Sequence, residues 1–478
     1  MARIAERMRK SISQKQMRLA APFGARLLLS FERATAVVLL AVLFLGVAFW
    51  NGYPLVFYDT GAYLAEGLEG AFLAERSPVY SFLLLFAGGK VSLWLPVLLQ
   101  ALMTAFLLLQ VARIETPRLS LPGLGLIGLA LMGLTGIGWY VGQVEPDCMT
   151  AILVLGTYLL LFRWGRLGWA RWWVGAVTGL SIACHPSHIG LTGGLLIAAA
   201  LVRWLPPGWR LPRPTLLPGT VALVAALALT IAANFVLTRQ IFIVRSGPVF
   251  LVARLMQDGI VKKLLDDACL PPGGGKRPYE LCAYKTRLKT RADAWLWSPD
   301  SVFHREGGFN GPHREEERII LDSFRRYPWL QIRMAVRDSI QQFFLFKTGD
   351  GIESQEWVLR PDFVRLLPDQ LPAYLSARQQ HQKFRFHPLN LIHVTVGVMS
   401  ILGSLLLLQH LVVRRRWDEA VLPALVLLAL IGNAIICGTF SNPHDRYQSR
   451  LIWLPAFVLL LALARDPAAL RPEDDGAG

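Results

Sequence analysis

The chain has 478 residues, of which 54% are hydrophobic and 17% charged, and its formal net charge is +16. With a mean hydropathy of +0.42, this composition excludes an ordinary soluble globular protein. The positive charge would suggest nucleic acid in a soluble protein, but here basic residues separate long apolar segments, so we expect membrane lipid and no nucleic acid as a partner.

The apolar segments predict an all-α polytopic membrane protein with about ten transmembrane helices. A bilayer core about 30 Å thick needs about 20 helical residues. The longer runs are Ala34–Trp50, Leu93–Val111, Leu121–Val141, Leu216–Val236, Leu389–Val413 and Ala420–Phe440. Shorter candidates are Met149–Phe162, Trp172–Ala183, Ile189–Val202 and Leu451–Ala464. Val79–Ala87 is too short to cross and predicts a half-inserted or interfacial helix.

Arginine and lysine predict which links lie in the cytoplasm, because short cytoplasmic loops are enriched in these residues. The head of the chain, residues 1–33, is basic, so we expect a cytoplasmic tail there. After ten spans, the tail 465–478 and the other short basic links fall on the same side. These links lie near Arg113, Arg163, Arg203 and Arg414.

The spans divide the chain into an N-terminal transmembrane module, a long outer segment and C-terminal transmembrane helices. The N-terminal module covers residues 34–238 and contains the first outer loop at 51–77. The outer segment covers 239–388. The C-terminal helices cover 389–464 and contain a last outer loop at 441–450.

The long outer segment is predicted to be mostly helical and irregular. Glu315–Arg337 and Asp338–Lys347 have apolar residues at helical spacing among charges, which predicts amphipathic helices on the outer leaflet. Cys269 and Cys282 lie in this segment. They form a disulfide in an oxidising compartment or remain two unrelated thiols, because sequence alone does not fix their Cα separation.

Asp59 in the first outer loop is the first candidate for chemistry. A carboxylate that follows Phe57 and Tyr58 near the mouth of a span is partly desolvated, which suits it to accept a proton from a hydroxyl group. The alternative is that Asp59 only caps a following helix. Further along the loop, Arg76 is placed either to bind a phosphate or to pair with Glu75.

Two further outer links carry polar residues at the ends of spans. Glu145 and Asp147 flank a proline at a helix start, which local helix preferences explain, although the carboxylates could also hold a divalent cation or orient an acceptor. His185 and His188 lie in a turn at membrane depth, where polar groups are costly and usually functional. Without a third ligand they do not predict a zinc site. We expect phosphate or sugar binding there, or a satisfied helix break.

The last outer link, Ser441–Arg450, is the densest polar cluster of the sequence. Arg446 and Arg450 are four positions apart, so on a helix they would present two guanidinium groups to a phosphate or pyrophosphate. His444 and Asp445 precede them directly. The alternative for the arginines is that they snorkel towards water from the end of a span.

This layout resembles the GT-C superfamily of polytopic glycosyltransferases, in particular bacterial mannosyl- and arabinosyltransferase-like members. The shared features are an acidic first outer loop, interfacial helices after the first span, a long outer loop and an arginine cluster before a late span. The resemblance implies a bacterial inner-membrane protein with cytoplasmic termini and a periplasmic active face. It implies Asp59 as the catalytic residue. The expected substrate-binding residues are Arg76, Glu145, Asp147, His185, His188, His444, Asp445, Arg446 and Arg450.

The implied reaction moves a sugar from a polyprenyl-phosphate carrier to a glycan, lipid or protein acceptor by a single displacement with inversion. Asp59 would take the acceptor proton while the arginines stabilise the departing phosphate. Many family members have paired acids where this chain has Asp59-Thr60-Gly61, so a divalent cation stays open and no other cofactor is expected. A lipid transporter and a non-catalytic assembly or binding protein are the alternative classes.

Overall fold

The computed structural model describes residues 23–206, 211–269, 278–305, 307–311 and 313–465, with side chains from residue 31 onward. Over these residues the regular structure is helical and contains no β-strand. The expected all-α fold is therefore confirmed for this part of the chain. The segments expected to be cytoplasmic tails, 1–33 and 465–478, lie mostly outside the described residues.

The N-terminal module is a succession of helices joined by short links. They are α2 (Phe23–Phe44), α3 (Gly46–Asn51), α4 (Thr60–Glu69), α5 (Pro78–Phe86), α6 (Trp94–Glu115), α7 (Leu121–Leu134), α8 (Ile137–Val141), α9 (Asp147–Phe162), α10 (Ala170–Ala183), α11 (Pro186–Trp204) and α12 (Leu216–Thr238). The 3-10 helix η1 (Trp164–Arg166) joins α9 to α10. The C-terminal helices are α21 (Phe386–Val413), α22 (Trp417–Phe440), α23 (Asp445–Ser449) and α24 (Trp453–Leu463).

Five of the described helices are long and apolar enough to cross a bilayer, namely α6, α11, α12, α21 and α22. Two shorter helices, α7 and α9, are also apolar. These helices support a membrane-embedded protein, whereas the full count of ten spans stays a prediction. The expected interfacial helix corresponds to α5, which has nine residues.

Two of the expected spans are not single helices. Leu121–Val141 is divided into α7 and α8, because the Thr135 hydroxyl group donates to the Leu131 carbonyl (2.6 Å) and accepts from the Ile137 N–H (3.4 Å). A side chain that takes over these bonds competes with the helical backbone ladder. Ala34–Trp50 is likewise divided between α2, which already begins at Phe23, and α3.

The outer segment contains a series of shorter helices. They are α13 (Gly247–Gln257), α14 (Ile260–Ala268), α15 (Ala292–Trp297), α16 (Val302–Arg305), α17 (Arg314–Arg326), α18 (Pro328–Phe344), α19 (Glu356–Leu366) and α20 (Leu371–Ser376), with 3-10 helices η3 (Glu280–Tyr284), η4 (Gly308–Asn310) and η5 (Pro368–Gln370). Helices α13 to α17 enclose a hydrophobic core of their own that includes Trp295 and Phe303. Cys269 and Cys282 form a disulfide, with Cα atoms 5.7 Å apart.

The two amphipathic helices of this segment differ from the expected ones in boundary. They are divided at Pro328, because proline lacks an N–H and disfavours the helical conformation of the residue before it. The second helix, α18, packs against the candidate span α22. At their contact a Cβ on Gly438 would lie 2.6 Å from the Ser339 nitrogen. That the two helices lie on the outer leaflet stays a prediction.

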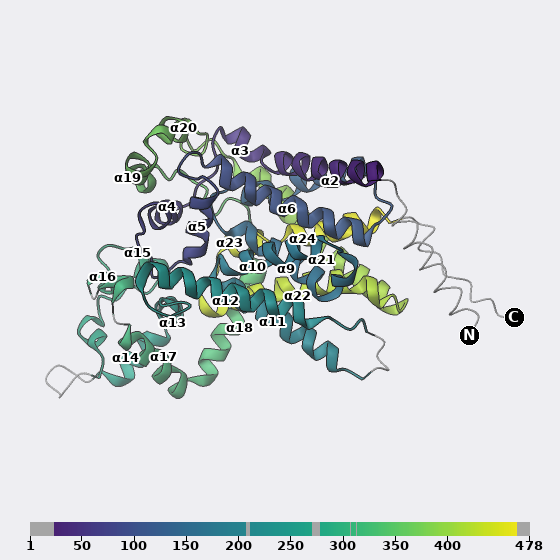
Figure 1. Cartoon of the computed structure of the whole chain (residues 1–478). Coiled ribbons are helices and arrows are strands. Elements are labelled where there is room, and N and C mark those ends of the chain that lie inside the picture. Colours follow the sequence, from purple (N-terminus) through teal and green to yellow (C-terminus); the bar gives the residue numbers. More distant parts are fainter. Residues whose placement is uncertain (1–22, 207–210, 270–277, 306, 312, 466–478) are drawn as a thin grey trace.

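Polar links gather at two separate ends of the bundle. At one end Glu115 binds Arg163 (2.7 Å) and Arg465 (3.1 Å), and Arg163 also binds Asp418 (2.9 Å), so the ends of α6, α9, α22 and α24 meet there. These links are among those that the arginine distribution places in the cytoplasm. Figure 1 shows α15, α16 and α19 of the outer segment near α4 and α5 at the other end, on the left of the view.

Candidate functional site

The first outer loop is joined to the link between α8 and α9 by an isolated parallel bridge. The Leu55 N–H donates to the Gly142 carbonyl (2.9 Å), and the Val144 N–H donates to the Leu55 carbonyl (2.8 Å). The Thr60 hydroxyl group adds a bond to the Val144 carbonyl (3.1 Å). These bonds bring Asp59, at the start of α4, next to Glu145, which is far away in sequence.

The same loop is held from its other side by Gln379. The Gln379 side chain accepts from the Val56 N–H (3.1 Å) and donates to the Val56 carbonyl (2.7 Å). Its backbone N–H donates to the Asn51 side chain (2.8 Å). Val56 and Gln379 are both buried. Sequence reasoning did not identify Gln379, because nothing in the local pattern indicates that residues 379 and 56 meet.

Asp59 occupies the N-cap position of α4, but its side chain makes no capping hydrogen bond. The carboxylate instead accepts from Arg76 Nη2 at 2.6 Å. The Arg76 guanidinium group also lies 5.8 Å from the ring centroid of Trp297, a residue of the outer segment. Of the two alternatives expected for Arg76, pairing with a carboxylate is observed, but the partner is Asp59 and not Glu75.

Arg446 and Arg450 both turn towards Asp147, the first residue of α9. Arg450 Nη1 lies 2.8 Å from Asp147 Oδ1, and Arg446 Nε lies 3.5 Å from Asp147 Oδ2. Arg450 also donates to Asn433 (3.2 Å), and its side chain is 1% exposed. The Arg446 guanidinium group stacks on Phe57, 3.9 Å from the ring centroid. Neither arginine therefore snorkels, and Arg450 is the more firmly held of the two.

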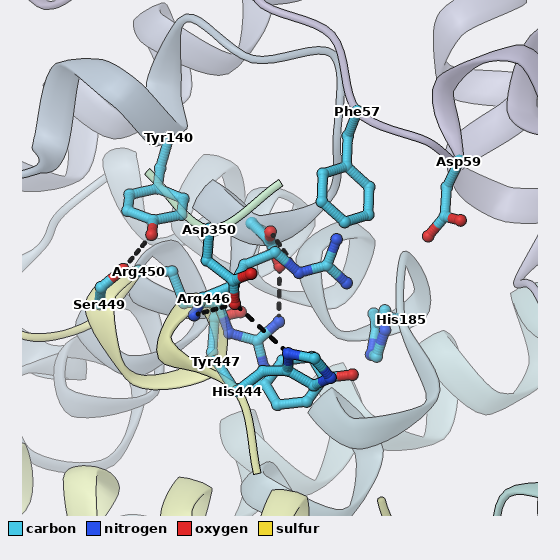
Figure 2. A network of polar contacts seen from close by, with 12 residues as sticks. Phe57, Asp59, Tyr140, His185, Asp350, His444, Arg446, Tyr447, Ser449 and Arg450 are labelled. Atoms are coloured by element: carbon cyan, nitrogen blue, oxygen red, sulfur yellow. Dashed lines mark hydrogen bonds and ion pairs between the residues drawn. The ribbon is translucent and has the colours of Figure 1, made fainter. Parts of the chain in front are cut away.

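Arg446 keeps hydrogen-bonding capacity that the protein does not use. Its side chain is 13% exposed, and its Nη1 has no hydrogen-bond partner among the described residues. Figure 2 shows the Phe57 ring, on which the Arg446 guanidinium stacks, with Asp59 to its right and His185 lower in the view. An unsatisfied buried donor of this kind favours a ligand that accepts hydrogen bonds.

The charge balance of this cluster depends on Glu145, which lies in the link between α8 and α9. The ionisable groups are Arg76, Arg446, Arg450, Asp59, Glu145 and Asp147. Burial first, and then the charge of Asp59, raise the pKa of Glu145 well above its ordinary value of 4.5, which favours the protonated form. Arg76, Arg446 and Arg450 face Asp59 and Asp147, while Asp350 faces His444, so a neutral Glu145 leaves these guanidinium groups with one excess positive charge, which favours an anionic ligand.

The two histidines of the α10–α11 link differ in their contacts. His185 is the N-cap of α11, and its Nδ1 accepts from the Ser187 N–H (3.2 Å). His188 contacts the Ser181 carbonyl through Nδ1 and the Thr150 hydroxyl group through Nε2, both at 2.7 Å. Both ring nitrogens of His188 are thus used in packing α11 against α9 and α10. His185 interacts electrostatically with Arg76, Arg446 and Arg450, and His188 interacts with Arg450 and Asp147.

His444 connects the last outer link to the outer segment. Its Nε2 lies 3.5 Å from Asp293 of α15, and its Nδ1 lies 3.5 Å from Asp350. Burial opposes the charged imidazolium, but the hydrogen bonds to the two carboxylates outweigh it and raise the pKa of His444 to about 10. Asp445 accepts from the Lys347 N–H (2.7 Å). His444 and Asp445 therefore hold the segment after α18 against α23.

Asp350 is a further member of the cluster that sequence reasoning missed. Its carboxylate accepts from the Arg446 backbone N–H (3.1 Å) in addition to its contact with His444. The available sequence signal was Gly349-Asp350-Gly351 after a predicted amphipathic helix. In the structure both glycines adopt positive φ. A Cβ on Gly351 would lie 1.8 Å from the Phe57 ring, so glycine there allows Phe57 to reach Arg446.

Two carboxylates of the cluster, Asp59 and Asp147, pair with guanidinium groups. Asp59 faces Arg76, and Asp147 faces Arg446 and Arg450. In the described part of the chain, no three His, Cys, Asp or Glu side chains converge as ligands for a metal ion. We therefore assign no metal ligand among the candidate residues.

No protein-family model, curated protein or solved structure matches this chain. The resemblance to GT-C glycosyltransferases consequently stays a prediction. What the structure adds is the meeting of Asp59, Arg76, Glu145, Asp147, His185, Arg446 and Arg450, together with His444 and Asp445, around the links at one end of the helical bundle.

Proposed function

We propose that the chain is a GT-C-type glycosyltransferase of the bacterial inner membrane, which moves a sugar from a polyprenyl-phosphate carrier to a glycan, lipid or protein acceptor on the periplasmic side. The observation that carries the proposal is the proximity of an acid from the first outer loop, Asp59, to an underused guanidinium group from the last, Arg446. An inverting transfer needs a proton acceptor on one side of the anomeric carbon and a stabilised phosphate on the other.

In the proposed step the acceptor hydroxyl oxygen attacks the anomeric carbon as the bond from that carbon to the carrier phosphate breaks. The proton of the hydroxyl group passes to Asp59, and the bonding electron pair leaves on the phosphate oxygen. Arg76 donates a hydrogen bond to Asp59 and so fixes the direction of its carboxylate. Arg446 Nη1 donates to the phosphate, while Arg450 holds Asp147 and adds positive charge.

Three features support an anionic lipid as the donor. Arg76, Arg446 and Arg450 carry one positive charge more than Asp59 and Asp147, with which they pair. The Phe57 ring covers one face of the Arg446 guanidinium group, and this cover keeps water from competing with a phosphate for that group. The cluster also lies at the end of helices that are apolar enough to cross a bilayer, where a lipid phosphate is found.

The test is transfer by the purified full-length protein in vesicles that contain polyprenyl phosphate carrying radiolabelled mannose or arabinose. Wild-type protein should consume one of these donors. Asp59→Asn should lower the rate of transfer by about 100-fold or more while the donor still binds, because a general base contributes about 10²–10⁴. Arg446→Ala should weaken binding of unlabelled polyprenyl phosphate by about tenfold or more. Asp300→Asn, an exposed acid of the outer segment, is the matched control.

Unchanged transfer by Asp59→Asn would remove Asp59 as the base. If wild-type protein neither consumes the donors nor binds polyprenyl phosphate, the proposal is wrong, and a non-catalytic assembly or binding protein becomes the better assignment. Movement of the lipid across the vesicle without transfer would instead indicate a transporter.

A further inference from the structure

A wide groove lies on the exposed face of α19, in the part of the outer segment that follows Asp350. Its volume is about 740 Å³, within the range of small-molecule sites. Trp357 contributes the largest side chain of the groove, and 77% of this residue is exposed. An exposed indole among polar side chains is the kind of residue that dominates many binding surfaces. The groove is lined by Ser354, Glu356, Trp357, Arg360, Pro361 and Val364.

The helix that carries the groove is held firmly against the first outer loop. α19 packs against α4 (Figure 1), and Leu359 and Phe363 are buried on the side of α19 opposite the groove. Phe363 stacks on Tyr374 of α20, with ring centroids 4.0 Å apart. A Cβ on Gly61 of α4 would lie 2.9 Å from Leu359 Cδ2, so glycine there allows the two helices to approach closely. Because Gly61 follows Asp59 almost directly, the groove is fixed relative to the candidate base.

Two stretches of chain connect the groove with the candidate site. Tyr58, directly before Asp59, lies edge-on to Trp357, with ring centroids 6.3 Å apart. The Tyr58 hydroxyl group donates to Glu353, which holds Tyr58 against the start of α19. The loop that carries Glu353 also carries Asp350 of the candidate site. A molecule that stacks on Trp357 would therefore lie next to chain segments that form the candidate site.

The groove combines an aromatic surface with exposed hydrogen-bonding groups. Beside Trp357, Glu356 and Arg360 pair at 2.9 Å and remain 42% and 57% exposed. A sugar ring has a face of C–H groups and a rim of hydroxyl groups. The C–H face packs on an indole, whose π-face is negative. The hydroxyl groups donate to carboxylates and accept from guanidinium groups. These groups match a sugar better than a hydrocarbon chain, which would desolvate the charges without offering them hydrogen bonds.

We propose that this groove binds a sugar residue of a glycan, and that this glycan is the acceptor of the transfer reaction. The inference rests on the proposed glycosyltransferase function and selects a glycan among its three acceptor classes. The membrane surface fits the groove less well, because helices that lie on a bilayer are rich in lysine and arginine along their polar face. Here Arg360 is paired with Glu356, and Glu353 adds another carboxylate at the start of the helix.

The experiment measures binding of the full-length protein, in neutral detergent, to an immobilised panel of bacterial envelope oligosaccharides without any lipid-linked donor. Wild-type protein should bind at least one oligosaccharide. Trp357→Ala should weaken this binding by about tenfold or more, because truncation removes the aromatic anchor. Trp329→Ala is the matched control. Trp329 is 80% exposed on α18 and does not line the groove, so its loss should leave binding unchanged.

A second measurement distinguishes a glycan from the membrane as the occupant of the groove. Wild-type protein and Trp357→Phe are reconstituted in nanodiscs with and without brominated phosphatidylcholine, and the difference between their fluorescence reports the Trp357 indole. Bromine should quench both proteins to the same extent, because the proposal places Trp357 in water. Stronger quenching of wild-type protein would place the indole in the bilayer and would overturn the proposal.

The proposal is also overturned if wild-type protein binds no oligosaccharide of the panel, or if Trp329→Ala weakens binding as much as Trp357→Ala. Its failure is distinguishable from failure of the proposed function. Consumption of the lipid-linked donor without glycan binding would retain the glycosyltransferase and remove the groove as its acceptor site. Glycan binding that depends on Trp357 without any transfer would retain the sugar site and overturn its role as an acceptor site.

Discussion

Glu145 determines the charge of the candidate site, and its substitution separates the roles of two neighbouring acids. Because burial and the charge of Asp59 raise the pKa of Glu145 and favour its protonated form, Glu145→Gln replaces it with a neutral side chain of similar shape. We expect transfer at pH 7 to stay within about threefold of wild type, whereas Asp59→Asn lowers it about 100-fold or more. Initial rates from the vesicle assay give the comparison. A loss in Glu145→Gln as large as that in Asp59→Asn would contradict the assigned protonation.

The same residue predicts a dependence of stability on pH. Burial and the neighbouring Asp59 raise the pKa of Glu145 above 4.5, so the folded protein keeps a proton that the unfolded chain releases. Stability therefore falls as pH rises from about 4.5 towards the raised pKa. Glu145→Gln should remove this part of the slope in thermal unfolding measured from pH 4.5 to 8. An equal slope in both proteins would contradict the raised pKa.

Residue types and sidedness were sufficient to predict that Asp59 and Arg446 lie at one face, but not how the side chains pair or that Asp350 joins them. Asp59 and Arg446 were placed at the same face from the order of spans alone. The pairing of Asp59 with Arg76 depends on the path of a loop. The hydrogen bonds of both His188 ring nitrogens, to Thr150 and Ser181, depend on helix packing. Neither pairing has a local sequence signal.

At the scale of elements, the first outer loop is positioned by contacts with a distant segment. Gln379→Ala would leave the buried N–H and carbonyl group of Val56 without partners. An unsatisfied buried group costs about 1–3 kcal/mol, so we expect a loss of about 2–4 kcal/mol in unfolding free energy. The denaturant midpoint of the detergent-solubilised protein measures it. Gln341→Ala, at an exposed position of α18, should change stability by less than about 0.5 kcal/mol.

Helix boundaries were predicted unevenly. The expected start at Val79 lies one residue after the start of α5 at Pro78, whereas α11 begins at Pro186, three residues before the expected Ile189, and the boundary at Pro328 was missed. The break between α7 and α8 was missed because threonine is common within apolar helices. Only the contacts of the Thr135 hydroxyl group show that the helix ends there.

At the scale of the whole molecule, composition was sufficient to predict the helical membrane class but not the number of spans. Helices α9, α10 and α24 have 16, 14 and 11 residues, shorter than the bilayer core requires of a straight helix. Their role depends on how neighbouring helices cover their ends. The buried polar links at both ends of the bundle show where such covering occurs.

Sidedness is the property on which the proposed chemistry depends, and the described cysteines make it testable in the full-length chain. Cys148, Cys184 and Cys437 are buried, and a disulfide joins Cys269 and Cys282, so an introduced cysteine should be the one that reacts.

Asp300→Cys lies at an exposed position of the outer segment. Gly165→Cys lies at the opposite end, where an added Cβ meets open space. In intact cells with a permeabilised outer membrane, a maleimide that does not cross the inner membrane should label the cysteine at 300 and not the one at 165. The reverse pattern would place Asp59 and Arg446 in the cytoplasm and would remove the periplasmic reaction.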